Sequence, residues 1–142
     1  MARSEATVEI EAPASDVFAW LVDPERRLQW VAGLVASEDL GGGRYRETME
    51  AGGRRVDVQS TVAELDEPRA VTVEMRGSGV TARASTRLEE LDGGRTRVTS
   101  SLDLELGGLL RFAGGMAARQ AQASLERSLR QLKLLVEERS RA

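Results

Sequence analysis

The chain has 142 residues, a formal net charge of −3, and neither histidine nor cysteine. Disulfides, the usual zinc and copper sites, Ser-His-Asp triads and Cys-His dyads are therefore excluded, and any general acid or base must be Asp, Glu, Tyr, Lys or water. The acidic balance argues against nucleic-acid binding, which needs a dense basic surface, and the length suits one domain spanning residues 1–142.

The N-terminal segment and the apolar runs predict where the protein resides. Residues 1–11 alternate and carry acidic side chains, so they lack the apolar core of a signal peptide. The longest apolar runs, around 18–22 and 134–136, are far too short to cross a bilayer. Together with the absence of cysteine, these features predict a soluble, cytoplasmic protein without stable membrane insertion.

The first elements in chain order are a strand and two short helices. Apolar residues at 6, 8 and 10 alternate with polar ones, which predicts a half-buried strand. Pro13 then opens a short helix with an apolar stripe. Asp23 and Pro24 are typical of an N-cap and a first helical position, and they predict a second short helix through about residue 32, with Trp30 near its end.

Glycine-rich turns separate the strands that follow, because glycine accepts the positive φ that tight turns require. These strands are predicted near 34–40, 43–51, 54–65, 70–76, 80–91 and 95–106. Their short connections favour an antiparallel meander. The last segment, about 108–140, is rich in good helix formers and predicts a long C-terminal helix that lies across the sheet.

Residue size along the inward-facing positions predicts a cavity. Along the predicted strands, the inward-facing positions near the ends carry bulky side chains. The inward-facing positions in the middle carry small ones, namely Ser60, Ala82, Ala84, Thr86 and Ser100. A folded core packs densely. The space left by these small residues must therefore be filled by a guest molecule, or closed by a near approach of helix and sheet.

The C-terminal helix shows the same change in size. Its apolar stripe is bulky from Leu125 to Val136, and it continues backward through Ala121, Ala118 and Gly114, which are small, to Leu110. Leu109, Phe112 and Met116 lie on the other side of an ideal helix. They predict either a lid beyond a kink at residues 114–115, or an apolar loop before a helix that starts near Met116.

The order of elements resembles a known superfamily. A strand followed by residues 11–18 (EAPASDVF), then by 21–24 (LVDP) and Trp30, resembles the opening of the START-like (SRPBCC, Bet v 1-like) proteins, in particular the bacterial polyketide cyclase/dehydrase type. The turn and strand at 93–99 (GGRTRVT) and the terminal helix continue the likeness. The resemblance implies an α+β helix-grip fold: a seven-stranded antiparallel sheet wrapped around a long C-terminal helix, with two short helices after the first strand and an apolar cavity.

Glu47 and Tyr45 are the candidate catalytic residues. Glu47 shares strand parity with Tyr45, so both face inward if the register holds. A carboxylate in an apolar pocket has a raised pKa and can act as a general acid or base, whereas an edge strand would leave Glu47 in water. The predicted ligand-binding residues are Trp30, Tyr45, Met49, Val58, Ser60, Val73, Ala82, Ala84, Thr86, Ser100, Phe112, Met116 and Ala121.

Three functions stay open at this point. The first is non-catalytic binding of a lipid-, polyketide- or isoprenoid-like molecule by a carrier or sensor. The second is a metal-free cyclase or dehydratase that uses Glu47 or Tyr45 for proton transfer, and the third is an accessory or assembly protein that acts through its surface. No cofactor or metal is expected, and both a monomer and a homodimer are compatible with the sequence.

Overall fold

A computed structural model describes residues 2–51, 53–107 and 114–141 of the chain. Its sheet contains seven antiparallel strands in the order β1-β7-β6-β5-β4-β3-β2. The strands are β1 (Ala2–Ile10), β2 (Leu34–Gly41), β3 (Arg44–Ala51), β4 (Arg54–Asp66), β5 (Ala70–Gly77), β6 (Val80–Leu91) and β7 (Arg95–Leu106). The helices are α1 (Ala14–Val22), α2 (Pro24–Trp30) and α3 (Gly114–Arg141).

This architecture confirms the helix-grip fold and the order of elements that the sequence predicts. The strand limits agree within a few residues. The long helix is described from Gly114 onward. Leu109 and Phe112 lie outside the described residues, as does the segment that would distinguish a kinked helix from an apolar loop. None of the described helices is long and apolar enough to cross a membrane.

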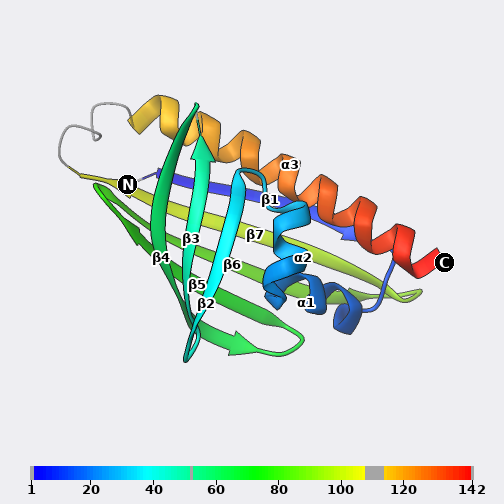
Figure 1. Cartoon of the computed structure of the whole chain (residues 1–142). Coiled ribbons are helices and arrows are strands. Elements are labelled where there is room, and N and C mark those ends of the chain that lie inside the picture. The colour runs from blue at the N-terminus through cyan, green and yellow to red at the C-terminus, as the bar shows by residue number, and fades with distance from the viewer. Residues whose placement is uncertain (1, 52, 108–113, 142) are drawn as a thin grey trace.

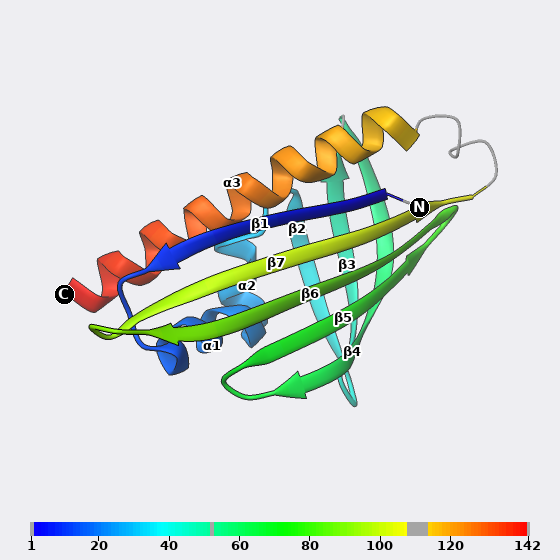
Figure 2. The same cartoon turned by 180° about the vertical axis from the view of Figure 1, so that it is seen from behind.

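The sheet is strongly twisted, and α3 lies along one side of it. In Figures 1 and 2, β2, β3 and β4 run steeply across the direction of β1 and β7. The helix packs chiefly along β1, with lesser contacts to β7, α1 and α2. It makes no extensive contact with β4, β5 or β6 in the described part of the chain. The central strands therefore face α3 across the concave side of the sheet, and their backbones do not come close to the helix.

Polar side chains of α3 fasten the helix to the outer edge of β1. The side-chain amide of Gln122 donates to the Glu5 carbonyl (2.9 Å) and accepts from the Glu5 N–H (3.1 Å). Farther along, Lys133 Nζ donates to the Glu9 carbonyl at 2.7 Å. Eleven helical residues span about 16 Å and four strand residues about 14 Å, so α3 runs parallel to β1. These bonds satisfy backbone groups that an edge strand would otherwise leave open.

A tightly packed cluster occupies one end of the concave side, which we call the packed end. It brings together α1, the C-terminal half of α3 and the adjoining parts of β1, β5, β6 and β7. Leu132 is 0% exposed and lies next to other fully buried residues of this cluster. Its members are Ile10, Ala12, Ala14, Val17, Phe18, Trp20, Leu21, Val71, Leu88, Val98, Leu129, Leu132 and Val136.

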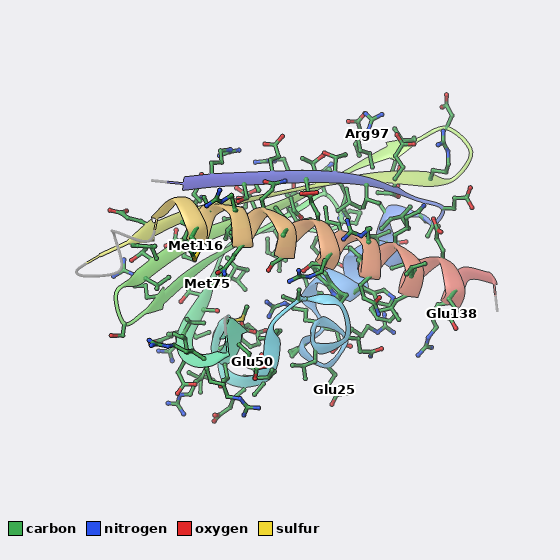
Figure 3. The ribbon with its side chains drawn as sticks, turned by 90° about the horizontal axis from the view of Figure 1, so that it is seen from above. Glu25, Glu50, Met75, Arg97, Met116 and Glu138 are labelled. Atoms are coloured by element: carbon green, nitrogen blue, oxygen red, sulfur yellow. The ribbon has the colours of Figure 1, made fainter. Side chains whose placement is uncertain are left out.

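The opposite end of the concave side, which we call the open end, is less completely packed. It is defined by the inward residues of three neighbouring rows of paired positions across β5, β6 and β7, together with the first turns of α3. Several of these residues belong to the central strands β5, β6 and β7 and are nevertheless only half-buried, namely Met75, Val80, Ala84, Leu102 and Leu104. Figure 3 shows Met75 and Met116 at this end, and Arg97 and Glu138 at the other.

Candidate ligand-binding site

Glu47 is the centre of a polar network on the concave side of the sheet. Its side chain is 1% exposed, and it is the only fully buried ionisable residue among the described ones. Arg27 donates to Oε2 from Nη1 at 2.5 Å and to Oε1 from Nη2 at 3.4 Å. The Ser37 hydroxyl donates to Oε2 at 2.9 Å, and the Ser60 hydroxyl donates to Oε1 at 2.8 Å. Each carboxylate oxygen therefore accepts two hydrogen bonds.

The register of three strands brings this network together. Ser37 in β2 lies directly opposite Glu47 in β3, and Ser60 in β4 lies opposite Tyr45, two residues away on the same face. A register shift in β2 between Leu34 and Ala36 aligns Ser37 with the inward face. Side chains at paired positions share one side of a sheet, so the serine hydroxyls and the carboxylate point into the same space.

Helix α2 supplies the guanidinium. Asp23 caps its start by accepting a hydrogen bond from the Glu25 N–H, and Pro24 occupies the first turn. At its other end, Trp30 Nε1 donates to the Trp20 carbonyl at 2.8 Å and ties the helix to α1. Arg27, whose side chain is 18% exposed, then reaches from this short helix to Glu47.

The connection from α2 to β2 depends on a close backbone approach at Gly33. Its φ is +86°, and a Cβ at this position would lie 2.8 Å from the Glu50 carbonyl oxygen. The Gly33 carbonyl itself accepts from the Glu50 N–H at 2.6 Å. Nearby, Ser128 of α3 accepts a hydrogen bond from the Ala32 N–H. Glycine therefore lets the chain pass closely enough to place α2 over β2 and β3.

The surroundings of Glu47 differ from the sequence-based expectation. The strand alternation predicts its inward orientation, but the predicted apolar environment is wrong, because an arginine and two serines surround the carboxylate. Arg27 and Ser37 are missing from the predicted site. One signal for Arg27 was present, since it precedes Trp30 by three residues and so shares a helix face with a predicted ligand-binding residue.

The other predicted ligand contacts are distributed along the concave side. Tyr45, Met49, Val73, Ala84, Thr86 and Trp30 are half-buried, while Val58, Ser60, Ala82 and Ser100 are buried. On α3, Ala121 is half-buried and Met116 is 61% exposed. The indole N–H of Trp30 is bound to a backbone carbonyl. A role in ligand binding or catalysis stays a prediction for each of these residues, and Phe112 lies outside the described residues.

A second hydroxyl pair faces the same side of the sheet. Thr86 in β6 and Ser100 in β7 are opposite each other, and their hydroxyl oxygens are 2.9 Å apart. Either hydroxyl can donate to the other. Their surroundings include the half-buried Ala84 and Leu102 of the next row. The concave side thus combines mostly apolar surface with a few hydrogen-bonding groups, which is the usual composition of a small-molecule site.

An open depression of about 330 Å³ lies over β5, β6 and β7. Most of its lining side chains have the strand parity that carries charged, exposed residues, so it belongs to the outer face. It is lined by Glu74, Met75, Arg76, Thr81, Ala82, Arg83, Asp103 and Glu105. Of these, only Ala82 was predicted to contact a ligand. The depression is therefore distinct from the apolar pocket that the sequence predicts.

The outer face otherwise carries solvated charges, as the strand alternation predicts. Arg83 pairs with Glu74 at 2.7 Å, and Arg97 pairs with Glu9 and Glu89. Within the described ranges, no group of three or more acidic side chains lies close enough together to hold a metal ion.

Comparisons with known proteins place this geometry in a family. The family model described as "Polyketide cyclase / dehydrase and lipid transport" matches residues 1–137. No curated protein matches the sequence.

Several solved structures are similar in fold. A START superfamily protein from Mycobacterium smegmatis is 20% identical, with a TM-score of 0.85 and coverage of 97% of this chain and 99% of the other. The ZhuI aromatase/cyclase from a Streptomyces species is 21% identical, with a TM-score of 0.79 and coverage of 99% and 96%. A Thermus thermophilus protein is 19% identical, with a TM-score of 0.81 and coverage of 97% and 99%. The match of the family model to residues 1–137, which is nearly the whole chain, shows that the chain belongs to the polyketide cyclase/dehydrase and lipid transport family.

Proposed function

We propose that the protein binds an apolar or amphipathic small molecule between the sheet and α3, as a carrier or sensor without catalysis. The observation that carries this proposal is the environment of Glu47. Its carboxylate is paired with Arg27 and accepts hydrogen bonds from Ser37 and Ser60. A general base must have a lone pair directed at the proton it removes, and here each oxygen already accepts two hydrogen bonds.

The packing of the open end supports the location of the guest. Central strands of a covered sheet normally bury their inward side chains, yet Met75, Ala84 and Leu104 are only half-buried. Helix α3 approaches the sheet chiefly along β1, and its close packing with residues of β5 and β6, such as Val71 and Leu88, belongs to the packed end. Burying such apolar surface against a guest is favourable by about 25 cal/mol per Å².

The second candidate function is a cyclase or dehydratase. The family description and the fold similarity to an aromatase/cyclase favour it. In that case Glu47 would have to exchange its Arg27 partner for substrate, or Tyr45, which is half-buried on the same face, would have to transfer the proton. An enzyme of this kind should lose turnover of a poly-β-ketone substrate in a Glu47→Gln or Tyr45→Phe variant, whereas a carrier shows no turnover to lose.

The proposal is tested by titration with N-phenyl-1-naphthylamine, an uncharged dye that fluoresces in apolar sites. We expect saturable binding by the wild-type protein and at least tenfold weaker binding by Ala84→Leu, which fills the concave side. The matched control, Arg87→Leu, adds the same side chain to the exposed face of the same strand and should bind like the wild type. Equal binding by all three proteins, or none by the wild type, would contradict the proposal.

A further inference from the structure

The charge distribution on the concave side limits the chemical class of the guest. In the described strands, all inward side chains that are buried or half-buried are apolar, hydroxyl-bearing or glycine, with the single exception of Glu47. Arg27 lies against that carboxylate and cancels its charge. The inward residues of α3 that approach this region, such as Ala118, Ala121 and Leu125, carry no charge. The interior is therefore electrically neutral as a whole.

From this balance we infer that the site selects an uncharged amphiphile carrying a hydroxyl group, and excludes the corresponding carboxylate. The inference rests on the proposed function. A guest anion would need an uncompensated cation, and Arg27 already binds Glu47 through two nitrogens. An anion placed there would instead add a second negative charge beside a buried carboxylate, which is unfavourable in a medium of low polarity.

The hydrogen-bonding capacity of the network points to the hydroxyl group. An ionised carboxylate can only accept hydrogen bonds, so Ser37 and Ser60 must direct their protons at Glu47. The oxygen of the half-buried Ser37 then keeps lone pairs as acceptors on the concave side, whereas Ser60 is only 1% exposed. Tyr45, opposite Ser60, has a phenolic O–H with no hydrogen-bond partner in the described part of the chain. A guest hydroxyl can donate a hydrogen bond to a serine oxygen and accept one from the Tyr45 O–H, so it matches this arrangement.

The inference is tested by competition between two guests that differ only in their head group. Decanol and decanoate displace N-phenyl-1-naphthylamine from the wild-type protein at pH 8, where the acid is ionised. We expect decanol to bind at least tenfold more tightly than decanoate. Equal affinities, or tighter binding of decanoate, would overturn the inference while leaving the proposed function intact. Failure of the dye itself to bind would instead contradict the proposed function.

Removing the carboxylate should abolish the preference for decanol. In Glu47→Gln the Arg27 cation loses its partner, so decanoate should gain at least tenfold in affinity relative to decanol. Glu50→Gln, an equivalent substitution at an exposed position of the same strand, should keep the wild-type preference.

A double variant guards against a Glu47→Gln protein that fails to fold. Arg27→Gln combined with Glu47→Gln removes both charges and keeps amide groups in their place, so it should prefer decanol as the wild type does. A double variant that prefers decanoate would contradict the inference, because no cation would then remain to explain it.

Discussion

The two ends of the concave side carry similar apolar side chains but bury them to different extents. At the packed end, α1 and the C-terminal half of α3 enclose leucines and valines such as Leu129 and Leu132 almost completely. At the open end, Met75, Leu102 and Leu104 point to the same side of the sheet but stay half-buried. From this difference we expect stability to be concentrated at the packed end, and the open end to be the part that receives the proposed guest.

The largest expected effect comes from deleting a buried leucine at the packed end. Leu132→Ala should lower the free energy of unfolding by about 3–4 kcal/mol, because it leaves a cavity in a fully buried cluster. Leu104→Ala at the open end should cost about 1 kcal/mol, since this side chain is only partly removed from water. Urea denaturation measures both values, and similar losses would remove the distinction between the ends.

The buried ion pair should be the next most sensitive feature. Glu47→Gln leaves the Arg27 guanidinium without its counter-ion in a largely buried position, and we expect a loss of about 3 kcal/mol. The matched change in the same strand as Glu47, Glu50→Gln, breaks an exposed pair with Arg55 of β4 and should cost less than about 0.5 kcal/mol. A small effect of Glu47→Gln in chemical denaturation would mean that the network contributes little to the fold.

Enlarging a side chain at each end tests the same difference in packing. Ala14→Leu introduces three carbon atoms into the packed end, where the alanine is buried, and should destabilise the protein by about 2 kcal/mol. Ala84→Leu at the open end should change stability by less than about 0.5 kcal/mol, since the added atoms enter space that is not closely packed. Thermal unfolding monitored by circular dichroism compares the two, and an equally harmful Ala84→Leu would show that helix and sheet close on each other.

The hydrogen bonds between Gln122 and β1 should hold the first half of α3 in place. Gln122→Ala removes both bonds to the Glu5 backbone and should cost about 1 kcal/mol. Hydrogen exchange of the Glu5 amide should become faster, while amides at the packed end keep their protection. Gln120→Ala, at an exposed position two residues earlier, serves as the control and should leave the Glu5 amide unchanged.

The smallest effect is expected at the turn after β4. The hydrogen bond from Arg69 holds the pKa of Asp66 below its usual value of 3.8. Since the folded pKa is the lower one, this contribution is present above pH 3.8 and is lost as the pH falls through the folded pKa. Both groups are exposed, so Asp66→Asn should reduce the acid sensitivity of the Tm only slightly. A large change would indicate contacts beyond this pair.

Local patterns were sufficient to predict the elements, because strand alternation, glycine turns and proline helix starts are each encoded within a few residues. The inward orientation of Glu47 followed from the same alternation. Its partner did not, since Arg27 lies on a separate helix twenty residues earlier and meets Glu47 only through the tertiary arrangement of α2 over β3. Ser37 was obscured by the register shift in β2, which changes the face of the residues that follow.

The most direct test of the account is to map where a guest binds. In methyl-resolved NMR spectra, decanol should shift the signals of Met75, Ala84, Leu102 and Leu104 and leave Leu129, Leu132 and Val136 unchanged. That result would place an uncharged amphiphile at the open end, as the account predicts. Unchanged signals at the open end under saturating decanol, or shifts confined to the packed end, would contradict it.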